Sequence, residues 1–185
     1  MAVLVEATSV IVRRDSIDRT FAGGWRGFLS CVPNATLCTD GQLARVGFMD
    51  PKAVESFVNH LRSSGLVFLS QGECIDLAVV DQQRGLTMPC GWLEFARMPF
   101  GEKGGQCAAC WLFEGLRLTA GIHFPGESLD IATPEGWKYA GSLSERFSFV
   151  PTGAMEERLK YLRTENGVDV FFDASTGREC FKPRD

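Results

Sequence analysis

The stretch DPKAVESFVNHLRSSG, residues 50–65, carries the clearest structural signal in the chain. Asp50 is a typical N-cap residue, and Pro51 suits the first helical position, where its missing N–H removes no hydrogen bond. Apolar residues then recur at helical spacing and form one stripe: Ala53, Val54, Phe57, Val58 and Leu61. Gly65 is placed to end the helix in the left-handed region. The stretch therefore predicts an amphipathic helix with a core-packed face.

Short apolar segments on both sides of this helix are typical of β-strands. LARVGFM (43–49) precedes the helix, and LVFL (66–69), CIDLAVVD (74–81) and GWLEFARM (91–98) follow it. Residues 43–98 are thus expected to run strand, helix, strand, strand, strand. The connection through the helix is long enough for a crossover, so we expect its two flanking strands to be parallel and the later strands to be antiparallel.

This element order resembles, in topology, the half-barrel module of the vicinal oxygen chelate family. That family holds a metal ion through histidine and glutamate side chains at strand positions. The segment 66–98 contains no histidine, so the resemblance implies a topology and carries no site residue. Topology alone does not specify a function.

The two ends of the chain add further strands. Residues 3–12 are rich in valine and isoleucine and predict a buried strand. They do not resemble a signal peptide, because Arg13 and Arg14 follow the apolar run instead of preceding it. Near the C-terminus, Asn-Gly within LKYLRTENGVDVFF predicts a β-hairpin. Residues 152–163 fit either a helix or a strand.

These segments together predict an α+β fold, with a mostly antiparallel sheet, helices on one face and a C-terminal β-hairpin. A length of 185 residues suits one domain, residues 1–185. The strongest shift in composition is PFGEKGGQ, a flexible turn at residues 99–106. If this turn divides the chain, the sub-halves are residues 1–98 and 107–185.

The charge balance argues against two classes of partner. The formal net charge is −4, and lysine and arginine form no run. Nucleic-acid binding needs a basic face that neutralises phosphates, and the sequence offers none. The apolar N-terminal run is interrupted by Glu6 and cannot span a bilayer. We therefore expect a cytoplasmic protein that binds neither nucleic acid nor membrane.

Cys107 and Cys110 form the single Cys-x-x-Cys motif among seven cysteines. A tetrahedral zinc site needs four ligands, and the chain has no second such pair and only two histidines, His60 and His123. The following residues WLF favour a strand, in which positions three apart point to opposite faces. We therefore interpret both thiols as packing residues and expect neither a metal nor a cofactor. The double substitution Cys107→Ser with Cys110→Ser should leave the zinc content of the protein unchanged, at zero.

One enzymatic alternative stays open. The irregular stretch GIHFPGESLDIATPEG, residues 121–136, places His123 near Glu127 and Asp130. Loops carry a large share of catalytic groups, and a histidine beside a carboxylate can act as a general base. This stretch is therefore the predicted site of a small enzyme or ligand-binding domain, if the protein is one.

The leading hypothesis is a non-enzymatic, partner-binding protein, such as an inhibitor or a toxin-neutralising immunity protein. Its acidic balance suits a basic partner, and tryptophans in glycine-containing loops suit binding hot spots. The candidate partner-binding residues are Trp25, Asp81, Glu94 and Trp137. A third possibility is a subunit that uses a sheet edge or helix face to build a homo-oligomer.

Overall fold

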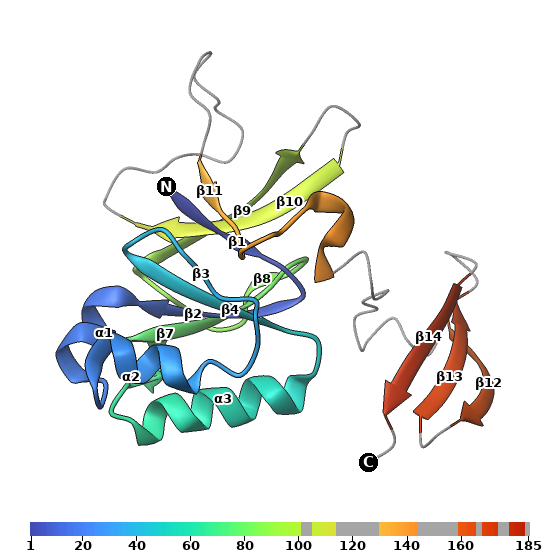
Figure 1. Cartoon of the computed structure of the whole chain (residues 1–185), viewed down its shortest axis with the longest axis horizontal. Helices are drawn as coiled ribbons and strands as arrows, with labels where there is room; N and C mark the ends of the chain where they lie inside the picture. Colours follow the sequence, from blue (N-terminus) through green and yellow to red (C-terminus); the bar gives the residue numbers. More distant parts are fainter. Residues whose placement is uncertain (101–104, 114–129, 144–158, 166–167, 174–177, 184–185) are drawn as a thin grey trace. The chain divides into compact units, whose positions relative to one another are not determined.

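The computed structural model describes residues 1–100, 105–113, 130–143, 159–165, 168–173 and 178–183 (Figure 1). The fold is α+β, as the sequence predicts, with both mixed and antiparallel sheets. The chain forms two compact units, Met1–Lys138 and Tyr139–Asp185.

The first unit is built in three layers, and Figure 1 shows them one above another. The helical layer contains α1 (Arg14–Thr20), α2 (Gly24–Cys31) and α3 (Pro51–Ser63). The middle layer is a five-stranded sheet in the order β3 (Cys38–Thr39), β4 (Leu43–Phe48), β2 (Thr8–Arg13), β7 (Leu77–Asp81) and β8 (Gly85–Leu86). The third layer is a four-stranded sheet in the order β11 (Ile131–Ala132), β1 (Ala2–Val5), β10 (Gly105–Leu112) and β9 (Leu93–Phe100).

Helix α3 forms where its sequence predicts it. The Asp50 carboxylate accepts a hydrogen bond from the Lys52 N–H at 3.0 Å, which caps the first turn. The predicted apolar stripe is turned toward the sheet, and its buried members are Val54, Phe57, Val58 and Leu61. Gly65 follows with φ of +109°, the left-handed conformation that an L side chain resists. The packed helix contributes stability mainly through this buried face.

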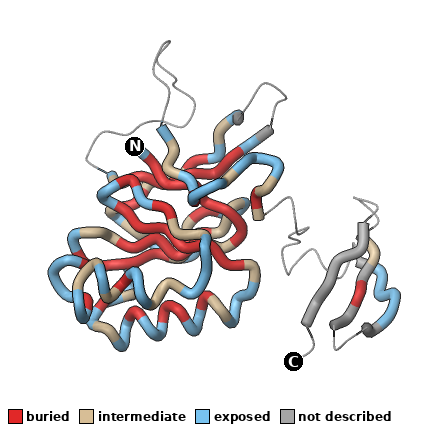
Figure 2. Tube along the Cα trace, viewed as in Figure 1, coloured by how far each residue is buried: buried red, intermediate tan, exposed pale blue. Residues whose placement is uncertain are grey.

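The central strands are buried on both faces, which Figure 2 shows as continuous red along β2 and β4. Side chains alternate along β2, so that Val10 and Val12 pack against the helices while Ile11 packs against the second sheet. In β7, Leu77 likewise belongs to the helix-side cluster and Ala78 to the inter-sheet cluster. A strand covered on both sides reads as a continuous apolar run, which explains the composition of these segments.

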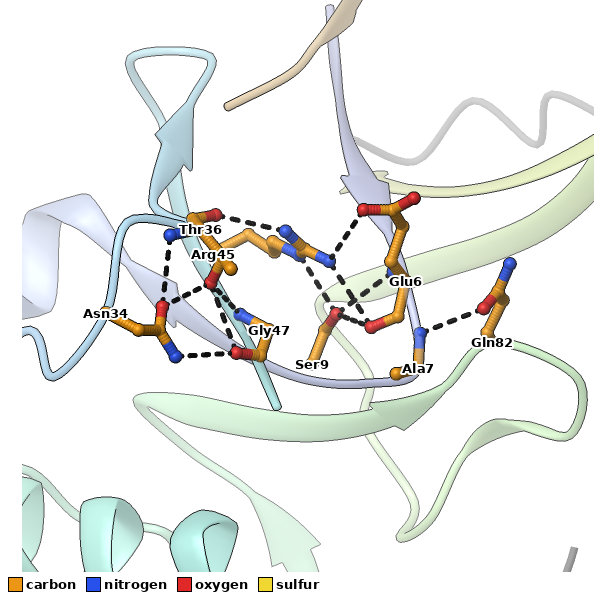
Figure 3. A network of polar contacts seen from close by, with 8 residues as sticks. All are labelled: Glu6, Ala7, Ser9, Asn34, Thr36, Arg45, Gly47 and Gln82. Atoms are coloured by element: carbon orange, nitrogen blue, oxygen red, sulfur yellow. Dashed lines mark hydrogen bonds and ion pairs between the residues drawn. The ribbon is translucent and has the colours of Figure 1, made fainter. Parts of the chain in front are cut away.

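Strands β1 and β2 meet at a corner where the chain leaves one sheet for the other. Ala7 has φ of +48° at this corner, and the backbone groups of Glu6 lie outside both ladders. The buried Arg45 side chain satisfies part of the corner, donating to the Glu6 carbonyl at 3.3 Å and to Ser9 Oγ at 2.9 Å (Figure 3). Its guanidinium also lies 4.0 Å from the Glu6 carboxylate. Buried backbone groups need such partners, so Arg45 replaces missing ladder bonds.

The same guanidinium fastens the loop before β3. Arg45 donates to the Thr36 carbonyl at 3.0 Å, and the Thr36 hydroxyl accepts the Gly47 N–H at 2.8 Å. Asn34 donates its amide to the Gly47 carbonyl at 2.9 Å (Figure 3). A Cβ at position 47 would lie only 2.7 Å from an Arg45 nitrogen. Glycine is therefore required there, because the arginine occupies the space a side chain would need.

One pairing prediction is wrong. The strands that flank α3 do not form a parallel pair, since β5 (Leu69–Ser70) joins β6 (Glu73–Cys74) in a separate antiparallel hairpin. The N-terminal strand β2 instead lies between β4 and β7 and pairs antiparallel with both. A strand brought from outside the segment 43–98 thus occupies the position expected for β5, and local spacing could not reveal that long-range pairing.

The turn expected at residues 99–106 lies between two strands of one sheet, because β9 and β10 pair across it from Phe100↔Gly105 to Leu93↔Leu112. Along the chain, the first compact unit ends at Lys138 and the second begins at Tyr139.

The second unit carries the predicted C-terminal hairpin. It begins with the short helix η1 (Tyr139–Gly141) and contains an antiparallel sheet in the order β12 (Leu159–Glu165), β13 (Val168–Asp173) and β14 (Arg178–Pro183). Residues 159–163, which fitted a helix or a strand, are strand. Residues 152–158 lie outside the described part.

Among the described residues, no helix is both long and apolar enough to cross a bilayer.

Candidate functional site

Two of the predicted partner-binding residues have structural contacts in the first unit. Trp25, half-buried on α2, stacks on Phe28 with ring centroids 5.3 Å apart, and the Arg14 guanidinium lies 4.0 Å from the Trp25 ring centroid. Asp81 accepts the backbone N–H groups of Gln83 at 2.9 Å and Arg84 at 2.8 Å, which caps the turn after β7. Both side chains therefore have an ordinary role in folding.

The other two predicted residues lie beyond the middle sheet. Glu94 is half-buried on β9 and stands directly opposite Trp111 of β10. Trp137 is half-buried against the inter-sheet cluster, while Trp25 belongs to the helix-side cluster. The five-stranded sheet separates these two clusters, so the structure does not bring Trp25 and Trp137 onto one surface.

The enzymatic alternative falls mostly outside the described residues. His123 and Glu127 lie in the segment 114–129, which the structure does not describe. Asp130 is exposed just before β11, and its backbone carbonyl accepts the Ala2 N–H at 3.0 Å. The arrangement of these three residues stays a prediction.

The described residues hold no group of three or more histidine, cysteine or acidic side chains placed to bind a metal ion. Cys107 and Cys110 lie in β10, as the strand interpretation predicted, and both are buried. Burial raises the pKa of each thiol, most strongly that of Cys110. Cys107 and Cys110 are closed off from solvent as well as held protonated, so they are poor metal ligands and nucleophiles.

A different surface stands out by its exposed apolar side chains. On the β5–β6 hairpin and its flanks, Val67, Leu69 and Ile75 are 45%, 39% and 37% exposed. The half-buried Trp92 adjoins them, since its indole N–H donates to the Cys74 carbonyl at 2.9 Å. We call Val67, Leu69, Ile75, Trp92 and the neighbouring Arg13 the hairpin surface. Side chains alternate along each strand, so Val67 and Leu69 lie on one face of the hairpin and Ile75 lies on the other. Exposed apolar groups gathered on one short hairpin of a well-packed unit are typical of a recognition site.

The hairpin ends in a tight turn with both central residues in the left-handed region. Gln71 has φ of +53° and Gly72 has φ of +85°, between the paired residues Ser70 and Glu73. Positive φ at both positions is the geometry of a type I′ turn, which suits the twist of a two-residue hairpin. Gln71 lacks the freedom of glycine, and a strained non-glycine residue of this kind costs about 1 kcal/mol or more.

The base of the hairpin is held by a buried carboxylate. Asp76 accepts the Val67 N–H at 2.8 Å and the Ser16 hydroxyl at 2.6 Å, which joins the hairpin to α1. The Arg19 guanidinium lies 3.6 Å from the same carboxylate. Backbone bonds from Asp76 to Val67 and from Ile75 to Phe68, at 2.9 and 3.0 Å, extend the pairing below β5 and β6. Asp76 lies inside the apolar segment CIDLAVVD, and these partners explain how its carboxylate can be buried.

A cation covers the aromatic edge of this surface. The Arg13 guanidinium lies 5.7 Å from the Trp92 ring centroid, within the range of a cation–π contact. Arg13 also binds Asp15 through two hydrogen bonds of 3.0 and 2.6 Å. These bonds hold the pKa of the Asp15 carboxyl below its usual range. The surface therefore combines an apolar centre with an oriented ion pair at its rim.

Sequence reasoning missed this surface because LVFL was interpreted as a strand that pairs in parallel with residues 43–49. Four apolar residues in a row carry no alternation, so the pattern cannot say which of them face solvent. The one available signal was the short Ser-Gln-Gly-Glu segment at residues 70–73, which indicates a tight hairpin between two short strands.

Comparison of the chain with protein-family models, with curated proteins and with solved structures finds no match in any of the three.

Proposed function

We propose that this chain is a non-enzymatic partner-binding protein, of the inhibitor or immunity-protein kind, and that the hairpin surface is its contact site. The observation that carries the proposal is the exposure of Val67, Leu69 and Ile75 within one short segment. Leaving large apolar side chains in water costs roughly 25 cal/mol per Å², and a partner that covers them recovers this free energy.

The anatomy of the hairpin surface supports the same proposal. Interfaces join an apolar centre, enriched in tryptophan and arginine, to a polar rim. Here Trp92 and Arg13 adjoin the apolar residues, and the exposed Glu73 and Asp15 lie at the edge. The net charge of −4 favours approach of a basic partner and raises the association rate more than the affinity. A partner contact of about 800 Å² on each side would be of standard size.

The test compares two variants in capture from the host cell. Val67→Ser with Leu69→Ser and Ile75→Ser removes the apolar centre, and Leu29→Ser removes one side chain of similar exposure, 42%, on α2. Wild type and Leu29→Ser should retain the same saturable protein partner, and the triple variant should bind it at least about tenfold more weakly.

Thermal unfolding and size-exclusion chromatography accompany the capture experiment. An unchanged melting temperature would show that the triple variant is folded. Its failure to retain the partner would then reflect the loss of the binding surface. Retention of the partner by the triple variant would disprove the assignment of the surface. If the wild-type protein is a dimer and the triple variant is a monomer, the hairpin surface binds a second copy of this chain and not a different protein.

A further inference from the structure

Two thiols meet directly beneath the hairpin. Cys74 ends β6 and is buried, and Cys90 is half-buried in the segment that leads from β8 to β9. The Cys74 N–H donates to the Pro89 carbonyl at 2.8 Å, which sets the two backbones side by side. The Trp92 indole N–H donates to the Cys74 carbonyl at 2.9 Å, so residues on both sides of Cys90 bond to the Cys74 backbone. The two thiols lie close enough for each to shift the pKa of the other. Neighbouring sulfurs on adjacent, fixed backbones meet the first requirement for a disulfide.

The surroundings of Cys90 differ from those of an inert core thiol. Burial raises the pKa of Cys90, but the nearby backbone N–H groups of Trp92 and Leu93 and the Arg13 guanidinium act against this shift. Such donors stabilise the thiolate, which is the form that reacts. Cys74 has no comparable donors, and burial raises its pKa to about 12. Cys90 is half-buried whereas Cys74 is only 3% exposed, so a peroxide reaches the Cys90 sulfur first and Cys74 is the second thiol.

We propose that Cys90 and Cys74 form a redox-active pair that a peroxide oxidises to an intramolecular disulfide. The Cys90 thiolate attacks one peroxide oxygen, so the O–O bond breaks and sulfenic acid and water form after protonation. The Cys74 sulfur then attacks the Cys90 sulfur, the S–S bond forms, and the hydroxyl leaves as a second water. Both thiols are oxidised and one hydrogen peroxide is reduced to two waters.

The bond would join β6 to the segment before β9 and so lock the base of the hairpin surface. This inference does not rest on the proposed partner-binding function, because the thiols are oxidised or not regardless of any partner. Burial raises the pKa of Cys90 above its ordinary value despite the donors. The thiolate fraction then grows with pH, so the oxidation rate should rise about tenfold per pH unit through the neutral range.

Peptide mapping tests the pair directly. The reduced full chain is treated with hydrogen peroxide, its remaining thiols are alkylated, and it is digested with trypsin. Cys74 and Cys90 are the single cysteines of the tryptic peptides 63–84 and 85–97. The expected result is a cross-link between these two peptides and the loss of two of the seven free thiols.

Three variants sharpen the mapping. In Cys74→Ser, Cys90 should accumulate as sulfenic acid that dimedone traps, and in Cys90→Ser the peptide 63–84 should stay reduced. Cys31→Ser is the matched control, since this half-buried thiol donates to the Phe28 carbonyl on α2. It should form the cross-link at the wild-type rate.

Two outcomes would overturn the proposal. One is that Cys74 and Cys90 of the wild-type protein both remain reduced after peroxide treatment, while the control thiol Cys31 is oxidised. The other is a cross-link from Cys90 to Cys110, whose buried sulfur is also near Cys90. The wild-type map decides between these results and the expected one, even if a serine variant fails to fold.

Discussion

The two faces of the five-stranded sheet are covered by different kinds of side-chain contact. The face toward the helices is filled by aliphatic and aromatic side chains, with Phe57 tilted against Phe28 and Phe48 at ring distances of 6.4 and 5.4 Å. The face toward the four-stranded sheet contains the fully buried Arg45 and its hydrogen bonds. The first face depends on shape, and the second depends on a matched set of donors and acceptors.

This difference has a physical cause. A helix satisfies its own backbone groups, so a helix–sheet contact can be wholly apolar. The corner between β1 and β2 leaves the Glu6 backbone without a ladder, and a charged side chain supplies its donor. Burial lowers the pKa of Arg45 below its usual range, while the nearby Cys38 and Glu6 oppose that shift. A guanidinium nevertheless stays protonated in proteins.

Removing the buried cation should have the largest effect. Arg45→Ala removes the arginine donor from the Thr36 carbonyl, leaves the Glu6 carbonyl with the Ser9 hydroxyl alone, and takes the cation from the buried Glu6 carboxylate. The free energy of unfolding should therefore fall by about 5 kcal/mol. Chemical denaturation measures the change. Arg97→Ala, at an exposed position on β9, is the control and should change stability by less than about 0.5 kcal/mol. A loss below about 1 kcal/mol in Arg45→Ala would mean that the corner does not depend on this network.

Phe57→Ala tests the apolar face. The side chain is buried and contacts two other phenylalanine rings, so its removal should cost about 4 kcal/mol through lost burial and a cavity. The same denaturation experiment measures the cost, with Leu29→Ala on the exposed side of α2 as the control. If Phe57→Ala costs less than about 1 kcal/mol, the stripe of α3 is not the packed surface described above.

Gly47→Ala separates shape from charge within the inter-sheet face. The added methyl group would meet the Arg45 guanidinium at 2.7 Å, and the overpacking should cost about 2 kcal/mol. In an Arg45→Met background the obstacle is absent, so the same change should cost much less. A double-mutant cycle measures the coupling. Additive costs would show that Arg45 is not what excludes a side chain at position 47.

Much of the local structure was predictable from the sequence. Helix α3 begins after Asp50 and ends before Gly65, as its cap, stripe and stop residue indicate. The strand assignment of Cys107 and Cys110 and the hairpin after β12 are also confirmed. In each case the deciding interactions lie within a few residues of one another, so the pattern along the chain records them.

The candidate site was not predictable in the same way. Trp25 and Trp137, both named as candidate partner-binding residues, belong to clusters on opposite sides of the five-stranded sheet. Val67 and Leu69 were expected in a strand of the main sheet and are exposed, because β5 pairs with β6 and not with that sheet. Strand pairing sets which face a residue occupies, and single-sequence periodicity does not contain the partner strand.

The sequence by itself determined the α+β class, the cap and buried face of helix α3, and the acidic balance of the chain. Tertiary structure alone decided that β2 lies between β4 and β7, that Arg45 bonds to residues of the corner, and that Cys74 meets Cys90. Helix capping and periodicity are short-range effects, whereas strand order and buried polar contacts join residues far apart in the chain. Only the closed fold brings such residues within bonding distance.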